Sequence, residues 1–195
     1  PDWSPPPGGV SSATELVALI RSVETRRCAR HASAALRAAV NPLTIAVAAF
    51  PSGNPAAGTS PAQEVERLLL KQAAGANFAI TQLFWDPEVY ISFVDDAKRA
   101  GVTIPILAGL LVPTDIERLS RTAELTGIDP PQALSQTLRD AEGAEAAVQA
   151  GILATARVAR AVLDSGAPGL HLYTYNKARP SLGLLARIGL FDPAA

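Results

Sequence analysis

Short apolar runs alternate with amphipathic segments along most of the chain. Four runs are typical of buried strands, because they are short, apolar and partly β-branched. The four predicted strands are residues 43–50, 78–85, 103–111 and 169–175. Since neither face of these runs is polar, we expect a sheet that is covered on both sides, which is a parallel sheet with crossover helices. The pattern predicts an α/β fold.

Helical periodicity and capping residues occupy the stretches between these strands. Ser60 and Gln63 predict a capping box at the start of a helix that runs to about Ala74. Thr114 and Glu117 predict a second capping box. Another predicted helix begins at Asp86-Pro87. A longer helical section follows residue 127 and is broken at Pro130-Pro131 and at Gly143. A last short helix is predicted over residues 181–188.

The chain before the first strand has a different pattern. Residues 1–11 are dense in proline and glycine, which predicts an irregular loop. Residues 13–24 have helical periodicity. One apolar face of this helix is made by Leu16, Leu19, Ile20 and Val23. Residues 26–40 are rich in alanine and arginine, and their pattern leaves open a second helix or a mobile excursion.

The alternation of strands and helices fits either an open doubly wound sheet or a barrel. No G-x-G-x-x-G sequence follows a strand and no P-loop is present, so Rossmann-type dinucleotide binding is poorly supported. Four strands are too few for a closed barrel, which needs about eight strands and ~250 residues. The chain alone would expose the edges of its first and last strands, which favours a missing half or a partner chain.

Composition narrows the function classes. The chain has 195 residues, of which 48% are hydrophobic, and a net charge of -1, which fits one domain, residues 1–195. The balanced charge gives no electrostatic reason to expect a nucleic acid or a membrane surface as partner. One cysteine, no visible signal peptide and no apolar run of about 20 residues favour a reducing, cytoplasmic location. Because the chain starts at Pro1 and contains no methionine, we expect sequence upstream of it.

In either architecture, functional residues gather at the carboxyl ends of the strands. This rule selects residues 50–60, 82–87, 111–115 and 173–180. Gln82 is the most informative of these positions, because burying an unpaired amide costs roughly 1–3 kcal/mol. Its partner is either a neighbouring strand or a ligand with a pterin or carboxamide edge, and the strand pattern leaves both open.

The last predicted strand ends in polar and aromatic residues. Tyr173 and Tyr175 could stack on a flat heterocycle, and Lys177 could neutralise an anionic tail. An ordinary solvated end of a strand explains the same residues and is favoured by the pattern alone. The sequence thus leaves a ligand site and a plain surface open at this position.

Three charged residues share one face of the helix after residue 60. They are Glu64, Arg67 and Lys71, and their spacing favours an exposed, salt-bridged surface over a binding site. Two histidines and one cysteine without metal-ligand spacing make a zinc site improbable. No nucleophile elbow and no obvious general acid are present.

Residues 74–86 carry a pattern that is specific to one family. The run has Gly75-Ala76, then Ile80-Thr81-Gln82 and then Asp86, and it closely resembles the sixth strand of methylenetetrahydrofolate reductases. Four other segments match in the same order. Residues 5–9 resemble the loop after the fourth strand, residues 46–51 the fifth strand, residues 106–111 the seventh and residues 171–177 the eighth.

The resemblance implies a (β/α)8 TIM barrel of which this chain supplies roughly the second half, strands 5–8. It implies an oxidoreductase of one-carbon metabolism and methionine biosynthesis that reduces 5,10-methylenetetrahydrofolate to 5-methyltetrahydrofolate. NADH or NADPH is the expected hydride source, and in the usual form FAD passes the hydride to the folate. A homo-oligomer is compatible with the resemblance. The family's catalytic glutamate lies on the first strand, outside this chain.

The resemblance also assigns site residues. It gives substrate binding to Gln82, Lys177 and Arg118, and cofactor binding to Phe50, Asn54, Glu64, Arg67, Lys71 and Gln82. Several of these depart from the family pattern, and Leu70 stands where a second basic residue is usual. A flavin-free enzyme is therefore as well supported as a flavoenzyme. The alternative from another class is a half-barrel that binds a ligand or a partner chain without catalysis.

Overall fold

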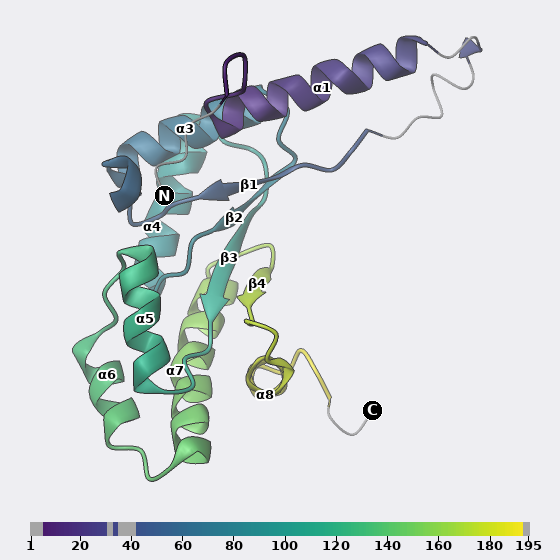
Figure 1. Ribbon diagram of the computed structural model, residues 1–195. Coiled ribbons are helices and arrows are strands. Elements are labelled where there is room, and N and C mark those ends of the chain that lie inside the picture. Colours follow the sequence, from purple (N-terminus) through teal and green to yellow (C-terminus); the bar gives the residue numbers. More distant parts are fainter. Residues whose placement is uncertain (1–5, 31–32, 35–41, 193–195) are drawn as a thin grey trace.

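The computed structural model describes residues 6–30, 33–34 and 42–192, and its elements are labelled in Figure 1. The strands are β1 (Ala46–Ala49), β2 (Phe78–Thr81), β3 (Ile106–Leu111) and β4 (Leu170–Tyr173). The helices are α1 (Ala13–Ala29), the 3-10 helix η1 (Pro55–Ala57), α3 (Pro61–Ala73), α4 (Pro87–Ala100), α5 (Ile116–Thr126), α6 (Gln132–Arg139), α7 (Ala144–Asp164) and α8 (Ala178–Arg187). Each predicted strand is present but shorter than its apolar run.

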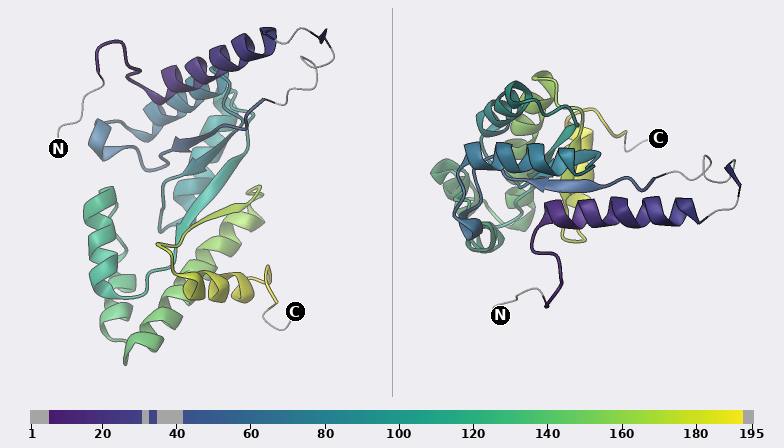
Figure 2. Two further views of the ribbon diagram at one scale, coloured as in Figure 1. Left: turned by 45° about the vertical axis from the view of Figure 1, so that its right-hand side comes forward. Right: turned by 90° about the horizontal axis from the view of Figure 1, so that it is seen from above.

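The four strands form one parallel sheet in the order β1-β2-β3-β4. In register, Ala48 lies opposite Ile80, Ile80 opposite Leu107, and Leu111 opposite Tyr173. The order of the strands in the sheet is their order in the sequence, so each connection leads to the next neighbouring strand. β1 and β4 are the two edges, and both views show α1 near β1 and α8 near β4 (Figures 1 and 2). The predicted α/β fold with a parallel sheet is confirmed.

The two faces of the sheet differ in burial. One face contributes to the main hydrophobic core, together with residues of α1, α3, α4, α7 and α8. Its strand residues are Val47, Ala49, Ala79, Ile106, Ala108 and Leu110. The alternate residues of β1, Ala46 and Ala48, are exposed, and Ile80 is only half-buried. The prediction of two covered faces is therefore wrong for the part of the chain that the structure describes.

Local capping explains where most helices begin and end. Ser60 and Gln63 form the predicted capping box, in which each backbone N–H donates to the other residue's side chain, at 3.3 and 2.9 Å. Asp86 caps α4 by accepting from a backbone N–H at 3.0 Å. Gly101 ends the same helix with a left-handed backbone, φ 100°. These termini depend on near neighbours only, so the sequence predicts them well.

The second predicted capping box, Thr114 with Glu117, is wrong. Asp115 caps α5 instead, because its Oδ1 accepts from the Arg118 N–H at 2.8 Å. The Thr114 hydroxyl donates to Asp115 Oδ2 at 3.0 Å and so supports the cap from outside the helix. An aspartate is a stronger acceptor than a threonine at this position, which moves the helix start by one residue.

The predicted apolar face of α1 is not buried. Leu16, Leu19 and Val23 are between 40% and 46% exposed, whereas Val17 on another face enters the main core. Arg21 also holds the helix through hydrogen bonds. Periodicity located the helix but not its buried side, because burial depends on which segments pack against the helix.

Arg21 fixes α1 to the chain at the amino ends of β1 and β2. Its guanidinium donates to the Gly75 carbonyl at 2.7 and 3.0 Å, to Asn77 Oδ1 at 2.6 Å and to the Leu43 carbonyl at 2.8 Å. These charge-assisted hydrogen bonds hold the helix in addition to the packing of Val17 in the main core. Most of the second predicted helical stretch, residues 31–32 and 35–41, lies outside the described residues, and so does His31.

The end of β4 differs from the prediction in a way that matters for the site. The strand stops at Tyr173, because Tyr175 and Asn176 adopt left-handed backbone conformations, φ 47° and 59°. α8 then begins at Ala178 rather than at Ser181. Two consecutive non-glycine residues with positive φ are uncommon and cost conformational energy.

α7 is a long and apolar helix. Its 21 residues are long and apolar enough to cross a membrane by length and composition alone. The sequence pattern did not indicate this, because Glu145, Arg157 and Arg160 interrupt the apolar run. Ile152 and Val162 of α7 belong to the main core, and a core helix passes the same test.

Candidate functional site

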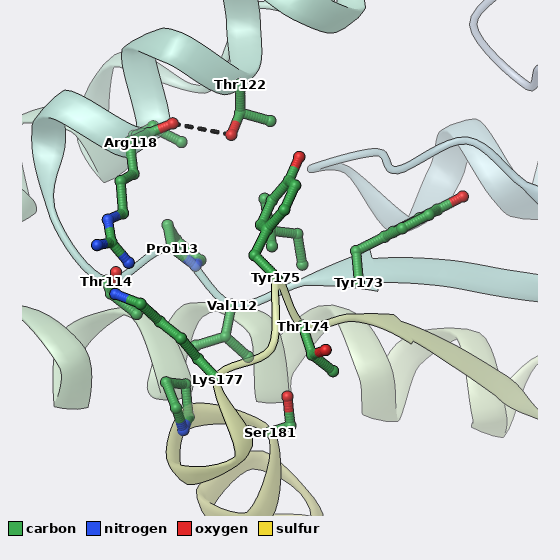
Figure 3. Close-up of a pocket in the computed structure, with 13 residues that line it drawn as sticks. Val112, Pro113, Thr114, Arg118, Thr122, Tyr173, Thr174, Tyr175, Lys177 and Ser181 are labelled. Atoms are coloured by element: carbon green, nitrogen blue, oxygen red, sulfur yellow. Dashed lines mark hydrogen bonds between the residues drawn. The ribbon is translucent and has the colours of Figure 1, made fainter.

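The carboxyl ends of parallel strands share one edge of a sheet, so the four loops predicted from the sequence lie along it. A pocket of about 30 Å³ opens between the ends of β3 and β4 (Figure 3). Its walls come from the segment after β3, from α5 and from the turn after β4. They are made by Leu111, Val112, Pro113, Thr114, Arg118, Leu119, Thr122, Tyr173, Thr174, Tyr175, Lys177, Pro180 and Ser181. The structure thus brings Arg118 and Lys177 together.

Arg118 is held in place by the first turn of α5. Its Nε lies 3.2 Å from Asp115 Oδ2, and its backbone carbonyl accepts from the Thr122 hydroxyl at 2.8 Å. Both side chains of the Arg118–Asp115 pair are about half exposed. An exposed pair of this kind contributes little to stability, so the guanidinium remains available to an anionic ligand.

Lys177 reaches the pocket from the turn after β4. Its backbone N–H donates to the Thr174 carbonyl at 2.8 Å, which closes the turn around the left-handed residues Tyr175 and Asn176. Figure 3 shows its side chain extending toward the same side of the pocket as Arg118. No carboxylate within the described residues pairs with it. The strained turn therefore positions an uncompensated positive charge at the pocket.

Tyr173 links this pocket to the neighbouring strand β2. Its hydroxyl donates to the Thr81 carbonyl at 2.9 Å, across β3. Gly109 permits this approach, because a Cβ there would lie 2.1 Å from the Thr81 carbonyl oxygen and 3.0 Å from the Tyr173 ring. Burial raises the pKa of Tyr173, with a smaller contribution from Tyr175, so the phenol stays protonated at neutral pH.

Gln82 lies next to this link but does not line the pocket. Its side-chain Oε1 accepts from the Leu83 N–H at 2.9 Å, and its own backbone N–H donates to the Ala49 carbonyl at 2.8 Å. The amide of this half-buried side chain donates to no acceptor among the described residues. The structural alternative, a side chain bonded to neighbouring strands, is therefore wrong, and the donor remains free for a ligand.

Glu64 and Lys71 are buried, so the predicted exposed salt-bridged face is wrong. Glu64 is 1% exposed and Lys71 8% exposed. Glu64 accepts from the Thr59 hydroxyl at 2.5 Å and from Arg67 at 3.1 Å. The ion pair with the partly exposed Arg67 exists as the spacing predicts. The burial follows from the side of α3 that faces β1, which spacing within one helix does not show.

The Lys71 ammonium is used inside the fold. Its Nζ donates to the Ala48 carbonyl of β1 at 2.8 Å and lies 5.9 Å from the centre of the Phe50 ring. Burial lowers the pKa of Lys71, while the Glu64 carboxylate opposes this shift and Arg67 adds to it. The lysine thus ties α3 to the end of β1.

Asn54 closes the loop between β1 and α3. Its backbone exchanges hydrogen bonds with Thr59 at 3.0 and 3.1 Å. Gly53 supplies the positive φ that this tight loop requires, and a Cβ there would lie 2.4 Å from the Thr59 carbonyl. The residues that the resemblance assigns to a flavin therefore lie in a hydrogen-bonded loop and in the helix α3 that follows it.

These residues do not fit the diphosphate of FAD. Lys71 is buried and bonded to a backbone carbonyl, and the guanidinium of Arg67 is paired with Glu64. Leu70 is 58% exposed at the position where a second cation is usual. A diphosphate needs free donors and positive charge, whereas the two cations of this segment are already engaged, Lys71 by the Ala48 carbonyl and Arg67 by the buried Glu64.

Arg121 is not among the site residues that the sequence predicts. It lies one turn after Arg118 on α5 and lines a wider groove that adjoins the pocket. Residues three apart on a helix lie on the same face, but the sequence does not show whether that face borders a groove or plain surface. Among the described residues, no three histidine, cysteine or acidic side chains gather as metal ligands would.

The model of the methylenetetrahydrofolate reductase family matches residues 1–189. The chain belongs to the methylenetetrahydrofolate reductase family. A probable methylenetetrahydrofolate reductase (NADPH) of Caenorhabditis elegans is 35% identical over 155 residues, which are 77% of this chain and 23% of that protein. The 5,10-methylenetetrahydrofolate reductase of Escherichia coli is 30% identical over 147 residues, 75% of this chain and 49% of that one.

The match therefore spans 23% of the length of the first of these reductases and 49% of the second. A solved structure of an uncharacterized protein from Clostridium thermocellum matches with a TM-score of 0.52 and 19% identity. The match covers 80% of this chain and 56% of that one, which binds two copies of 5-methyl-5,6,7,8-tetrahydrofolic acid. At this identity the likeness concerns the α/β fold.

Proposed function

We propose that this chain is the second half of a (β/α)8 barrel and that the complete barrel is a methylenetetrahydrofolate reductase. Its reaction is the reduction of 5,10-methylenetetrahydrofolate to 5-methyltetrahydrofolate with NADH or NADPH. The observation that carries the proposal is the pocket that joins Arg118 and Lys177 at the carboxyl edge of the sheet. In this family member, the pocket supplies positive charge for an anionic substrate.

The topology supports a barrel over a doubly wound sheet. A doubly wound sheet reverses its strand order at a switch point, whereas β1 to β4 follow one another without reversal. Within the described residues no further strand pairs with the outer edge of β1 or of β4, and one face of β1 is open as the inside of a half-barrel would be. Four more strands would pair these edges and cover that face.

The site residues have distinct roles in this proposal. The free amide of Gln82 holds polar edges of the pterin and of the nicotinamide, because an amide can donate and accept together. Arg118 and Lys177 hold the anionic end of the folate. A proton from a group outside this chain opens the five-membered ring to an iminium. The nicotinamide then delivers hydride to the methylene carbon, which becomes the methyl group.

A variant of Gln82 tests these roles. We expect Gln82→Ala to lower kcat/KM for methylenetetrahydrofolate by about a hundredfold, since a ligand-directed hydrogen bond in a closed site contributes several kcal/mol. The matched control is Gln149→Ala, which removes an exposed glutamine of α7 and should leave turnover unchanged. Circular dichroism must show the same fold for both variants. Unchanged turnover in the Gln82 variant contradicts the assignment.

We propose further that hydride passes directly from the nicotinamide, because residues 50–71 do not fit a flavin diphosphate. The test is the absorbance spectrum of the purified full-length protein, followed by NADH oxidation with and without the folate. Folate-dependent oxidation without flavin bands is the expected result. Flavin bands contradict the flavin-free form only, whereas absent folate-dependent oxidation contradicts the reductase.

A further inference from the structure

A second cleft lies at the opposite end of the sheet from the pocket, where β3 and β4 begin. It has a volume of about 320 Å³ and is formed by α4, by the segment that leads into β3 and by the turn between α7 and β4. Among the described residues, none lines both the cleft and the pocket. A concave space of this size is large enough for a small molecule. The cleft is therefore a separate candidate site.

The walls of the cleft are mostly apolar. Tyr90 of α4 lies beneath it, 1% exposed, and its hydroxyl proton is already donated to a backbone carbonyl at 2.7 Å. The aliphatic side chains of the wall come from α4 and from the segment that leads into β3. They are Ile91, Val94, Val102, Ile104, Pro105 and Ile106. This part of the cleft fits an apolar group.

Several polar groups around the cleft are already bonded within the fold. The backbone N–H groups of Thr103 and Ile104 donate to Gln72 Oε1 at 2.7 and 3.0 Å. The Ser165 hydroxyl donates to the Val162 carbonyl at 2.8 Å. These donors are therefore not available to a ligand, and recognition of a polar ligand falls to the charged side chains of the cleft.

Two exposed side chains of opposite charge line the cleft, Asp95 and Lys98. They lie three residues apart on α4 and therefore on one face of the helix. Neither forms an ion pair among the described residues, whereas Asp96 and Arg99, one residue further along the same helix, pair with each other. The cleft thus presents a carboxylate and an ammonium group, both without an ionic partner, beside an apolar wall.

We infer that this cleft binds an α-amino acid with an apolar side chain. The ammonium group of the ligand pairs with Asp95, its carboxylate pairs with Lys98, and its side chain lies against the aliphatic wall. A purely anionic ligand, such as a nucleotide phosphate or the tail of a folate, is disfavoured because it would lie beside Asp95. The inference goes beyond the proposed function and does not depend on it, because binding is measured without turnover.

The test is isothermal titration calorimetry of the full-length protein with L-leucine at neutral pH. Three matched ligands each lack one part of leucine. Isocaproate lacks the ammonium group, isoamylamine lacks the carboxylate and glycine lacks the apolar side chain. We expect saturable binding of leucine, and binding of each matched ligand that is about tenfold weaker or more, since one charge-assisted hydrogen bond or one buried leucine side chain contributes at least this factor.

Two variants assign the charges. Asp95→Asn should weaken the binding of leucine about tenfold and should not weaken that of isocaproate, because isocaproate has no ammonium group to pair with Asp95. Lys98→Gln should weaken leucine by a similar factor and should not weaken isoamylamine. The matched control is Asp96→Asn, which removes a neighbouring carboxylate that does not line the cleft and should leave leucine binding as in the wild type.

Three results would overturn the inference. They are the absence of saturable leucine binding to the folded protein, an equal affinity for leucine and isocaproate, and equal losses of leucine binding in Asp95→Asn and Asp96→Asn. Each result is independent of whether the protein reduces methylenetetrahydrofolate. Leucine binding without folate-dependent turnover would support the cleft and contradict the reductase.

Discussion

Charged residues near the end of β1 are buried and bonded within the fold, whereas those near the ends of β3 and β4 line a pocket. Glu64 and Lys71 lie under β1, almost fully buried and bonded to Thr59 and Ala48. Arg118 and Lys177 lie on the walls of a pocket with only exposed partners or none among the described residues. Both pairs stand at positions that the resemblance to the reductase family assigns to ligand binding, although most of them depart from the family's usual residue type. The difference teaches that a matching residue can bind a ligand only when the fold leaves its charge free.

The largest effect that we expect is a loss of stability when a buried charged residue under β1 is replaced. We expect Glu64→Ala to lower the free energy of unfolding by about 3 kcal/mol, because it removes the partner of Arg67 and of the Thr59 hydroxyl from a buried site. Urea unfolding measures the change. Glu66→Ala is the matched control on the exposed side of α3 and should change stability by less than about 0.5 kcal/mol. Equal losses in both variants would remove the distinction.

A second variant tests the pocket side of the comparison. We expect Lys177→Ala to raise the KM for the folate about tenfold, because a charge-assisted hydrogen bond to a carboxylate contributes about 1.5 kcal/mol or more. Its free energy of unfolding should stay within about 0.5 kcal/mol of the wild type. Steady-state kinetics and urea unfolding check the two parts. A loss of stability with an unchanged KM would show that Lys177 supports the fold, as Glu64 and Lys71 do, and does not bind the folate.

The smallest effect that we expect is the loss of stability at high pH that is due to Tyr90. Burial raises the pKa of Tyr90 to about 12, and its hydroxyl donates to the Ile106 carbonyl at 2.7 Å. The contribution of Tyr90 to stability is fully present below about pH 10, the unfolded pKa, and is lost as pH rises toward 12, because the unfolded chain releases its proton first.

Unfolding measured between pH 9 and pH 11.5 should therefore show a decline in stability that Tyr90→Phe reduces. Tyr175→Phe is the control at an exposed position and should keep the decline of the wild type. An unchanged slope in the Tyr90 variant would show that this hydroxyl titrates as it does in water.

Much of the fold could be predicted from the sequence. The order of strands and helices, the capping box at Ser60 and the stop at Gly101 all follow from residues within one turn of each other. The errors arose where distant segments decide. The leucine face of α1, the covered faces of the sheet and the end of β4 each depend on what packs against them.

The candidate site was predicted only in part. Gln82, Arg118 and Lys177 were identified by their resemblance to the family, and the structure places the last two around one pocket. Arg121 was not identified, because an arginine on an amphipathic helix has no feature in sequence that separates a groove from plain surface. Its place in a groove depends on Tyr175 and Lys177, which come from the turn after β4.

The sequence by itself determined the α/β class, the positions of the elements and the residue types at the carboxyl ends of the strands. Periodicity and capping depend on residues that are close together in the sequence, so they can be recognised without the structure. The tertiary structure decided which charges are free. Lys71 is buried because β1 supplies a carbonyl to it, and Lys177 is available because a left-handed turn carries it to the open end of the sheet. Burial and partnership arise from chain segments far apart in sequence, and only the folded arrangement brings those segments together.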